Sequence, residues 1–361
     1  MKPFKNLFLL LIIPLFMGCV KDQNPPVSSG GMYYPPMAHG TWNKTNPGSL
    51  KWNTGKLNNL NTYLKNKNTK GFIMLKDGKI VVEQYFNGHG INANWTWYSA
   101  AKSLTSTLVG IAQEENLLNI DDKTSTHLGE NWSSLSKVKQ DSIKVKHHIT
   151  MSTGLQNPIS DFVQWTCTAP SCFKYQASAG SRWAYHQGAF TLTQNILTKA
   201  TGMDFKTYCK QKLQDKIGMN GKWDNLLDVR VFSSTTRSMA RFGLLALNKG
   251  VWNEDTIYPQ AYYNEMTNSS QDHNKAYGYL WWLNGKSDFL GTADQTLYNG
   301  PLIPNAPSDL FCALGAQDQK IYVIPSLNMV VVRSGEPAGN TEFANSSFDN
   351  ELWGKIMEIL P

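Results

Sequence analysis

The chain has 361 residues, 41% of them hydrophobic and 17% charged, and its 34 basic and 27 acidic residues give a net charge of +7. The basic residues are dispersed rather than grouped in a stripe, which argues against nucleic-acid binding and for a soluble domain. The roughly 310 residues after residue 50 are enough for one large domain or two subdomains, and they contain no internal repeat.

The first 18 residues have the pattern of an export signal. Two lysines precede an apolar run over residues 7–16, which is shorter than the ~20 residues that a membrane-spanning helix needs. The run ends in Gly18-Cys19, a pair typical of a bacterial lipoprotein cleavage box, in which Cys19 becomes the lipidated first residue. Phe16 departs from the leucine usual at its position, so a plain secretory signal and an uncleaved anchor remain alternatives. No inner-membrane retention residue follows Cys19, so we expect a lipid anchor in the bacterial cell envelope, on the periplasmic side of the outer membrane.

The folded domain is expected to follow a tether. Residues 19–50 carry proline pairs and a Ser-Ser-Gly-Gly cluster with few aliphatic residues, which predicts a tether before a domain over residues 51–361. Leucines at helical spacing then predict a helix that starts near residue 57. Apolar residues over 71–85 predict a β-hairpin, with Asp77-Gly78 as its type I′ turn.

The most informative feature is Ser99-Ala100-Ala101-Lys102, which joins an extended segment to a helical one. A serine at a helix start has its own N–H among the unpaired donors there, at the positive end of the helix dipole. A lysine three residues later projects from the same side and can reach the serine oxygen. The pattern therefore predicts an activated nucleophile and half of an oxyanion hole. An ordinary helix N-terminus is the alternative, since Ser-x-x-Lys recurs in less suitable settings at Ser134, Ser136 and Ser171.

The rest of the chain separates into a helical block and late strands. Helical pieces and loops fill residues 120–270, with helices expected at 192–201, 205–217 and 238–248. Strands are expected at 277–283, 320–324 and 329–333, and a closing amphipathic helix near 349–360. This order predicts an antiparallel sheet lobe from about residues 51–100 and 275–361, and a helical lobe from about 101–274. A cleft between two such lobes is a common place for an active site.

The cysteines indicate one local disulfide. Four remain apart from Cys19, and they permit three pairings. Cys167 and Cys172 flank a turn-forming Thr-Ala-Pro-Ser insert, so an oxidising compartment would favour a disulfide between them. The pairing of Cys209 and Cys312 stays open. Zinc is the weaker alternative, because the histidines are scattered and no His-Glu-x-x-His occurs. No metal or cofactor is expected.

Taken together, these motifs resemble those of a known family. The chain resembles the serine β-lactamase and penicillin-binding-protein-like superfamily in its class C and esterase-like branch, and within it the 6-aminohexanoate-dimer hydrolase type of serine hydrolase. The resemblance covers roughly residues 45–335. The segments that carry it stand in the family's order, at residues 68–83, 99–102, 149–155, 183–188, 238–245, 313–319 and 321–332. It implies an α+β, β-lactamase/transpeptidase-like fold, with an antiparallel sheet flanked by helices and a mostly helical lobe.

The resemblance also implies roles for the motif residues. Ser99 would be the nucleophile, Lys102 its partner, and Tyr185 the tyrosine of the second motif. A phenol is a poor base at its free pKa near ~10. Beside the Lys102 ammonium its anionic form would be favoured, so that the pair relays a proton between Ser99 and the leaving group.

The third motif of the family often reads Lys-Thr-Gly, and here it corresponds to Ala313-Leu314-Gly315. The backbone N–H of Ala316 would complete the oxyanion hole with that of Ser99, a role that needs no particular side chain. Ala313 cannot supply the cation that helps to hold the carboxylate of a β-lactam or of a peptide ending in D-alanine. Gln187 stands where asparagine is usual, so it would contact substrate from a shifted position.

Three functions remain in competition. The leading one is a serine hydrolase that acts through an acyl-enzyme on small carboxylic esters or short amides. The second is a β-lactamase or peptidoglycan D,D-peptidase, which the periplasmic address favours and Ala313 disfavours. The third is a non-catalytic cell-surface binding lipoprotein. Several tryptophans near the motifs are candidates for the wall of an apolar cleft, although most are expected in the core: Trp95, Trp97, Trp183, Trp281 and Trp282.

Overall fold

The fold is described from a computed structural model, in which the described residues are 31–37, 41–293, 295–340 and 345–361. The predicted signal peptide and Cys19 lie outside them. None of the helices in these ranges is long and apolar enough to cross a membrane.

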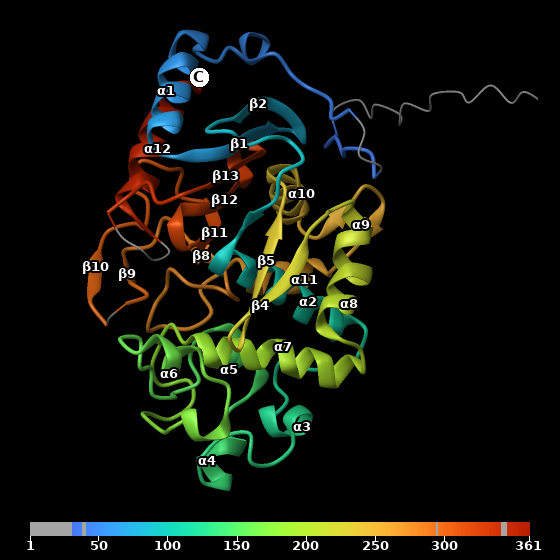
Figure 1. Cartoon of the computed structure of the whole chain (residues 1–361), viewed down its shortest axis with the longest axis vertical. Coiled ribbons are helices and arrows are strands. Elements are labelled where there is room, and N and C mark those ends of the chain that lie inside the picture. Colours follow the sequence, from blue (N-terminus) through green and yellow to red (C-terminus); the bar gives the residue numbers. More distant parts are fainter. Residues whose placement is uncertain (1–30, 38–40, 294, 341–344) are drawn as a thin grey trace, which may run out of the picture. The chain divides into compact units, whose positions relative to one another are not determined.

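A six-stranded antiparallel sheet organises the described part of the chain, in the order β2-β1-β13-β12-β11-β8 (Figure 1). Its strands are β1 (Thr69–Lys76), β2 (Lys79–Tyr85), β8 (Trp282–Leu283), β11 (Phe311–Gly315), β12 (Gln319–Ile324) and β13 (Met329–Gly335). The early hairpin thus pairs with strands from the end of the chain, as the sequence predicts. A second sheet contains β3 (Trp95–Thr96), β5 (Val229–Ser234) and β4 (Lys222–Leu226). Two short pairs join β6 (Val251–Trp252) to β7 (Asp255–Thr256), and β9 (Asp288–Leu290) to β10 (Leu297–Asn299).

Most helices lie between β3 and β8 in the chain. The α-helices are α1 (Leu57–Asn66), α2 (Lys102–Glu114), α3 (Thr124–Leu128), α4 (Lys137–Asp141), α5 (Val145–Ile149), α6 (Phe162–Thr166), α7 (Gln187–Thr201), α8 (Phe205–Cys209), α9 (Asp215–Ile217), α10 (Thr236–Leu247), α11 (Gln260–Met266) and α12 (Ser347–Met357). The predicted α+β class is confirmed. The predicted helix over 205–217 is divided by a π-helical turn, η5 (Lys210–Gln214), and the predicted strand over 277–283 shortens to β8.

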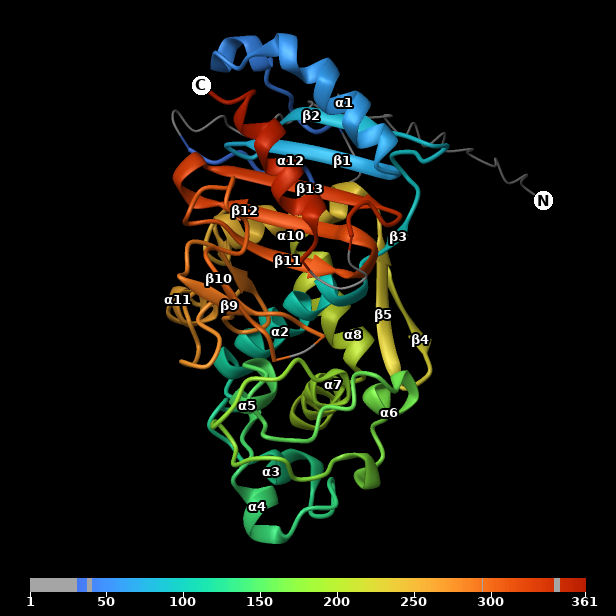
Figure 2. The ribbon, with the colours of Figure 1, turned by 90° about the vertical axis from the view of Figure 1, so that its left-hand side faces the viewer.

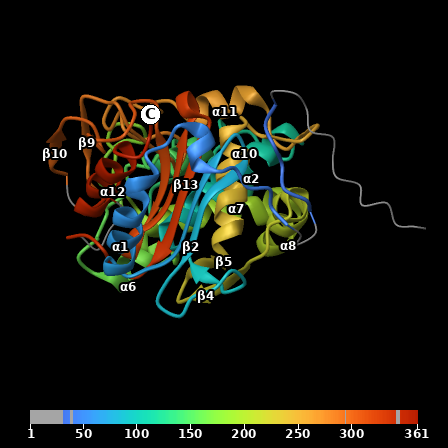
Figure 3. The same cartoon turned by 90° about the horizontal axis from the view of Figure 1, so that it is seen from above.

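Helices cover both faces of the central sheet, with α1 and α12 on one side and α10 on the other (Figures 2 and 3). Successive side chains of β12 point to opposite faces of the sheet, as the two-residue repeat of a strand requires. Lys320 and Tyr322 bond to Asp349 of α12, whereas Ile321 faces Gly243 of α10. The contact of β12 with α10 is therefore apolar, and the α12 face contains a buried polar network.

The hairpin turn shows how local sequence fixes register. Asp77 and Gly78 both have positive φ, 50° and 79°, as a type I′ turn demands. A Cβ atom on Gly78 would lie 1.8 Å from the carbonyl oxygen of Tyr33, so the segment before the domain packs directly on this turn. Trp42 is buried as well and donates from Nε1 to the carbonyl of Gly78 at 2.8 Å. The compact unit spans Met32–Pro361, so it includes this segment.

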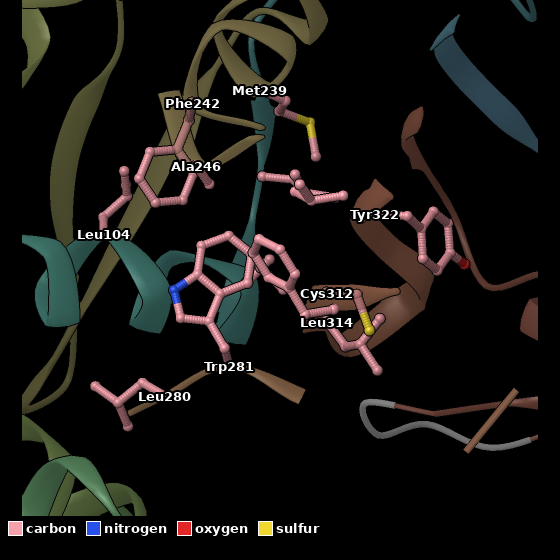
Figure 4. Close-up of a cluster of buried hydrophobic side chains, with 14 of the residues drawn as sticks. Leu104, Met239, Phe242, Ala246, Leu280, Trp281, Cys312, Leu314 and Tyr322 are labelled. Atoms are coloured by element: carbon pink, nitrogen blue, oxygen red, sulfur yellow. The ribbon is translucent and has the colours of Figure 1, made fainter. Parts of the chain in front are cut away.

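A cluster of buried apolar side chains joins α2 and α10 to the sheet (Figure 4). Trp281 is fully buried in it, stacks on Phe242 with ring centroids 5.6 Å apart, and meets Phe311 edge-on at 5.1 Å. Its indole N–H has no hydrogen-bond partner among the described residues. Shape and apolar area, rather than hydrogen bonding, therefore account for its contribution to stability.

Replacing Trp281 tests this packing. Trp281→Ala should lower the free energy of unfolding by about 3–5 kcal/mol, because it removes a large apolar side chain and leaves a cavity. Trp281→Phe should cost clearly less, since it keeps most of the apolar contact and deletes the unpaired N–H. Urea unfolding followed by circular dichroism measures both values. Equal losses for the two variants would contradict this account.

Candidate active site

Ser99 lies in a strained turn between the second sheet and α2. The chain leaves β3, enters the 3-10 turn η3 (Tyr98–Ala101) and continues into α2, so Ser99 precedes the α-helix itself. Tyr98 has φ 47°, a conformation uncommon for a residue other than glycine. The backbone N–H of Trp97 donates to the carbonyl of Phe232 on β5 at 2.8 Å, which fixes the entry to the turn. Such strain persists only where the surrounding structure holds it, and it is typical of functional sites.

Lys102 is buried against the nucleophile candidate. Its Nζ donates to Ser99 Oγ at 3.0 Å and to Gln187 Oε1 at 2.5 Å, and its side chain is 3% exposed. The amine also lies 5.0 Å from the ring centroid of Tyr185 and 4.5 Å from that of Phe190. Burial lowers the pKa of Lys102 to about 7, because the ammonium loses its hydration. A large neutral fraction of the amine is therefore present near neutral pH.

Tyr185 lies near the same serine. It is buried, and its side chain lies near enough to Ser99 for the serine hydroxyl to influence its pKa. Burial raises the pKa of Tyr185 well above that of a free phenol, and the nearby Ser99 hydroxyl offsets only part of this rise. The protonation states therefore differ from the sequence-based expectation of an ammonium beside a phenolate. The structure supports a partly neutral amine beside a neutral phenol.

The end of β11 completes the site through a close backbone approach. A Cβ atom on Gly315 would lie 2.2 Å from the carbonyl oxygen of Trp97 and 3.0 Å from the backbone nitrogen of Ala100. Only glycine leaves room for the strand to press against the Ser99 turn in this way. The next residue, Ala316, lines the same pocket as Ser99.

A buried arginine fixes the turn after Ala316 through hydrogen bonds to its backbone. Gln317 and Asp318 both have positive φ, 57° and 59°. Arg333, on β13, donates from Nη1 to their two carbonyl oxygens at 3.0 and 2.9 Å. The Asp318 carboxylate in turn lies 3.1 Å from the amine of Lys320 and accepts from Ser346 Oγ at 2.6 Å. These contacts hold the β11–β12 turn in a conformation that non-glycine residues rarely adopt unaided.

An open pocket of about 210 Å³ includes Ser99 in its wall. Four residues predicted for the site line it, namely Ser99, Lys102, Gln187 and Ala316. Apolar side chains make up most of the remaining wall: Ala101, Phe162, Trp165, Phe190, Trp223, Leu226, Val229 and Val231. Tyr98, Thr166 and Arg230 complete it.

Several predicted residues take other places. Tyr185 reaches Ser99 without lining the pocket, and neither Ala313 nor Gly315 lies on its surface. Ala313 is buried in β11, so it is separated from the pocket by packing. The expected tryptophans also lie elsewhere. Trp97, Trp183 and Trp281 are core residues, Trp282 lines a different pocket, and Trp165 and Trp223 supply the aromatic wall.

The cysteine insert lies directly after one wall of the pocket. Cys167 and Cys172 form a disulfide with their Cα atoms 6.1 Å apart. It closes the loop that follows α6, the helix that contributes Phe162, Trp165 and Thr166 to the pocket. Cys209 and Cys312 are free and buried. Within the described ranges, no three histidine, cysteine or acidic side chains are placed to share a metal ion.

Comparison with family models identifies the chain. Residues 71–334, well over half of the sequence, match the model of the family described as Beta-lactamase. The chain belongs to the β-lactamase family. The residues that meet at the pocket, from Ser99 to Ala316, all fall inside the matched stretch. No curated protein matches the sequence.

Solved structures confirm the β-lactamase/transpeptidase-like fold of this β-lactamase-family chain. A Bacillus anthracis protein named as a 6-aminohexanoate-dimer hydrolase superposes with a TM-score of 0.65 at 20% identity, over 82% of this chain and 80% of that one. A penicillin-binding protein homologue from Caulobacter crescentus gives 0.65 at 11% identity, over 88% and 98%. A family VIII carboxylesterase gives 0.62 at 11% identity, over 88% and 99%. At these identities the likeness is one of fold.

Sequence reasoning missed the far wall of the pocket. Strands β4 and β5 were not predicted, so Trp223, Leu226 and Arg230 could not be placed beside Ser99. Their signal was weak, because apolar and polar residues alternate only over 222–224 and 228–231. The contact of Gln187 with Lys102 was also missed, because nothing in the sequence shows which way that amide points.

Gly315 offers a sharp test of the close approach. Gly315→Ala should slow labelling of Ser99 by a fluorophosphonate at least tenfold, because the new Cβ must push β11 away from the turn that carries the serine. It should also lower the free energy of unfolding by about 1–3 kcal/mol, as overpacking does. Gly90→Ala is the matched control, since a Cβ there meets no atom within 4 Å. A Gly315→Ala variant that is labelled at the unaltered rate would refute the argument.

Proposed function

We propose that this protein is a serine hydrolase that forms an acyl-enzyme at Ser99 and acts on carboxylic esters or short amides. One observation carries the proposal: the hydroxyl of a serine at the edge of an open pocket accepts a hydrogen bond from a buried amine and lies beside a buried phenol. This is the arrangement of an activated nucleophile, in which a base lies within hydrogen-bonding distance and a second group orients the pair.

In the proposed acylation step, the neutral Lys102 amine takes the proton of the Ser99 hydroxyl as Oγ attacks the carbonyl carbon. The tetrahedral oxyanion is held by the backbone N–H groups of Ser99 and Ala316, and each such donor is worth on the order of 3 kcal/mol. Tyr185, which stays protonated, donates its proton to the leaving group and regains one from Lys102. Water then attacks the acyl-enzyme by the same route in reverse order and frees the acid.

The apolar wall favours esters and short amides over peptidoglycan. An apolar acyl chain gains free energy from burial against Phe190 and Trp223, at roughly 25 cal/mol per Å². Ala313 provides no cation for the carboxylate of a β-lactam or D-alanyl peptide. The structural neighbours named as a carboxylesterase and as an aminohexanoate-dimer hydrolase agree with this substrate class. The neighbour named as a penicillin-binding protein homologue keeps β-lactam or D,D-peptidase activity as the second candidate.

The proposal includes a place in the cell. Lipidation of Cys19 would attach the domain to the bacterial envelope, facing the periplasm, where a disulfide between Cys167 and Cys172 is stable. Small esters and amides that cross the outer membrane would then reach the pocket.

Ser99→Ala should abolish hydrolysis of p-nitrophenyl butyrate while leaving the melting temperature nearly unchanged, because the hydroxyl is a small, half-buried group. Mass spectrometry of the wild type after fluorophosphonate treatment should find the adduct on Ser99. Nitrocefin and a fluorescent penicillin, assayed on the same preparations, separate the second candidate from the first. Full turnover by the purified variant would remove Ser99 from the mechanism.

The pKa of Lys102 predicts the pH profile. The amine acts when it is neutral, so kcat/KM should fall about tenfold per pH unit below pH 7 and level off above it. Lys102→Arg should show no such rise near pH 7, because a guanidinium stays protonated. Initial rates between pH 5 and 9 measure this. A wild-type profile that is flat through this range, or that falls as the pH rises through 7, would contradict the assignment of Lys102 as the base.

A further inference from the structure

The pocket contains a second basic side chain besides Lys102. Its far wall comes from the second sheet, where Val229, Arg230 and Val231 of β5 all line the pocket. Figure 2 shows the ends of β4 and β5 next to α6, and Thr168 after that helix bonds to Asp228 in the β4–β5 turn. Arg230 and Ser99 therefore line the same pocket.

The hydrogen bonds of Arg230 within the described residues go to neutral groups. Its Nη1 donates to Gln194 Oε1 at 3.2 Å and to Asn195 Oδ1 at 3.1 Å, both on α7. No ion pair within the described ranges involves Arg230. By contrast, Arg237 makes two hydrogen bonds to the carboxylate of Glu83. Among the described residues, no carboxylate is hydrogen-bonded to Arg230, and Asp204 acts on its charge only from a longer distance than an ion pair.

The partly buried surroundings of Arg230 strengthen its attraction for an anion. Arg230 is half-buried, its guanidinium lies 5.7 Å from the ring centroid of Phe205, and apolar side chains surround it in the pocket. Attraction between charges is stronger where water is partly excluded. Two amide oxygens on Nη1 fix one end of the planar group, and the remaining edge of a guanidinium matches a carboxylate with two parallel hydrogen bonds.

We propose that Arg230 binds a carboxylate at the far end of the substrate's hydrocarbon chain, so that the preferred substrates are acyl compounds with a terminal acidic group. This inference rests on the proposed hydrolase function and narrows its substrate class. The apolar residues between Ser99 and Arg230 bury the chain, and the guanidinium selects the anionic end over a methyl group. Arg230 does not take the place of the cation of the family's third motif, where this chain has Ala313. Arg230 lies on β5 of the second sheet, whereas Ala313 lies on β11 of the central sheet.

Two p-nitrophenyl esters of equal carbon number test this selection: the hexanoate and the hydrogen adipate, which differ in the chain end. The wild type should prefer the adipate, with a kcat/KM ratio of at least about ten. Arg230→Gln should reduce that ratio at least tenfold, and Arg230→Lys should retain part of it. Glutamine still offers a donor to Gln194 and Asn195, so it preserves the contact with α7. Lys222→Met, which removes an exposed charge from β4 outside the pocket, should leave the ratio unchanged.

A binding measurement separates this inference from the hydrolase proposal. Calorimetry with hexanoate should give a dissociation constant at least tenfold weaker for Arg230→Gln than for the wild type. Neutral-ester turnover with no preference for the adipate would overturn the inference and leave the hydrolase standing. Failure to hydrolyse either ester would refute the proposed hydrolase function. The calorimetric titration with hexanoate would then decide by itself whether Arg230 binds a carboxylate. An adipate-to-hexanoate ratio that Arg230→Gln does not change would reduce Arg230 to a structural link between β5 and α7.

Discussion

The candidate site depends on one close approach of two backbones. Gly315, at the end of β11, lies so near the Trp97–Ala100 turn that a single added carbon would collide with it. This contact brings a strand of the central sheet against the turn that precedes α2, and it places Ala316 and Ser99 in one pocket wall. A side chain at position 315 would separate them, so the absence of a Cβ decides whether the site exists.

The polar residues on the α12 face of the central sheet hold the turn that follows Gly315. Arg333 holds the carbonyl oxygens of Gln317 and Asp318, and the Lys320 amine lies between the carboxylates of Asp318 and Asp349. Buried charges are costly to desolvate, and replacing such groups by apolar ones is often neutral or stabilising. We therefore assign these charges a role in positioning rather than in stability. They fix a turn with two left-handed residues directly after the proposed oxyanion donor.

Burial also sets the chemistry of the polar pair at Ser99. Removing water from an amine disfavours its charged form, and removing water from a phenol does the same. The two effects move the pKa of Lys102 down and that of Tyr185 up. An ammonium–phenolate pair would need the opposite shift in both groups. The base and the acid of the proposed mechanism are thus assigned by solvation more than by the attraction between the two side chains.

The sequence by itself determined what depends on neighbours in the chain: the Asp77-Gly78 turn, the pairing of an early hairpin with late strands, and the serine and lysine one turn apart. It also indicated Tyr185 and the third motif through resemblance to a family. Only the tertiary structure decided the aromatic wall from Trp165 and Trp223, the contact of Gln187 with Lys102, and the place of Arg230. These features depend on which surfaces exclude water and on contacts between segments far apart in the chain, and no local periodicity encodes either one.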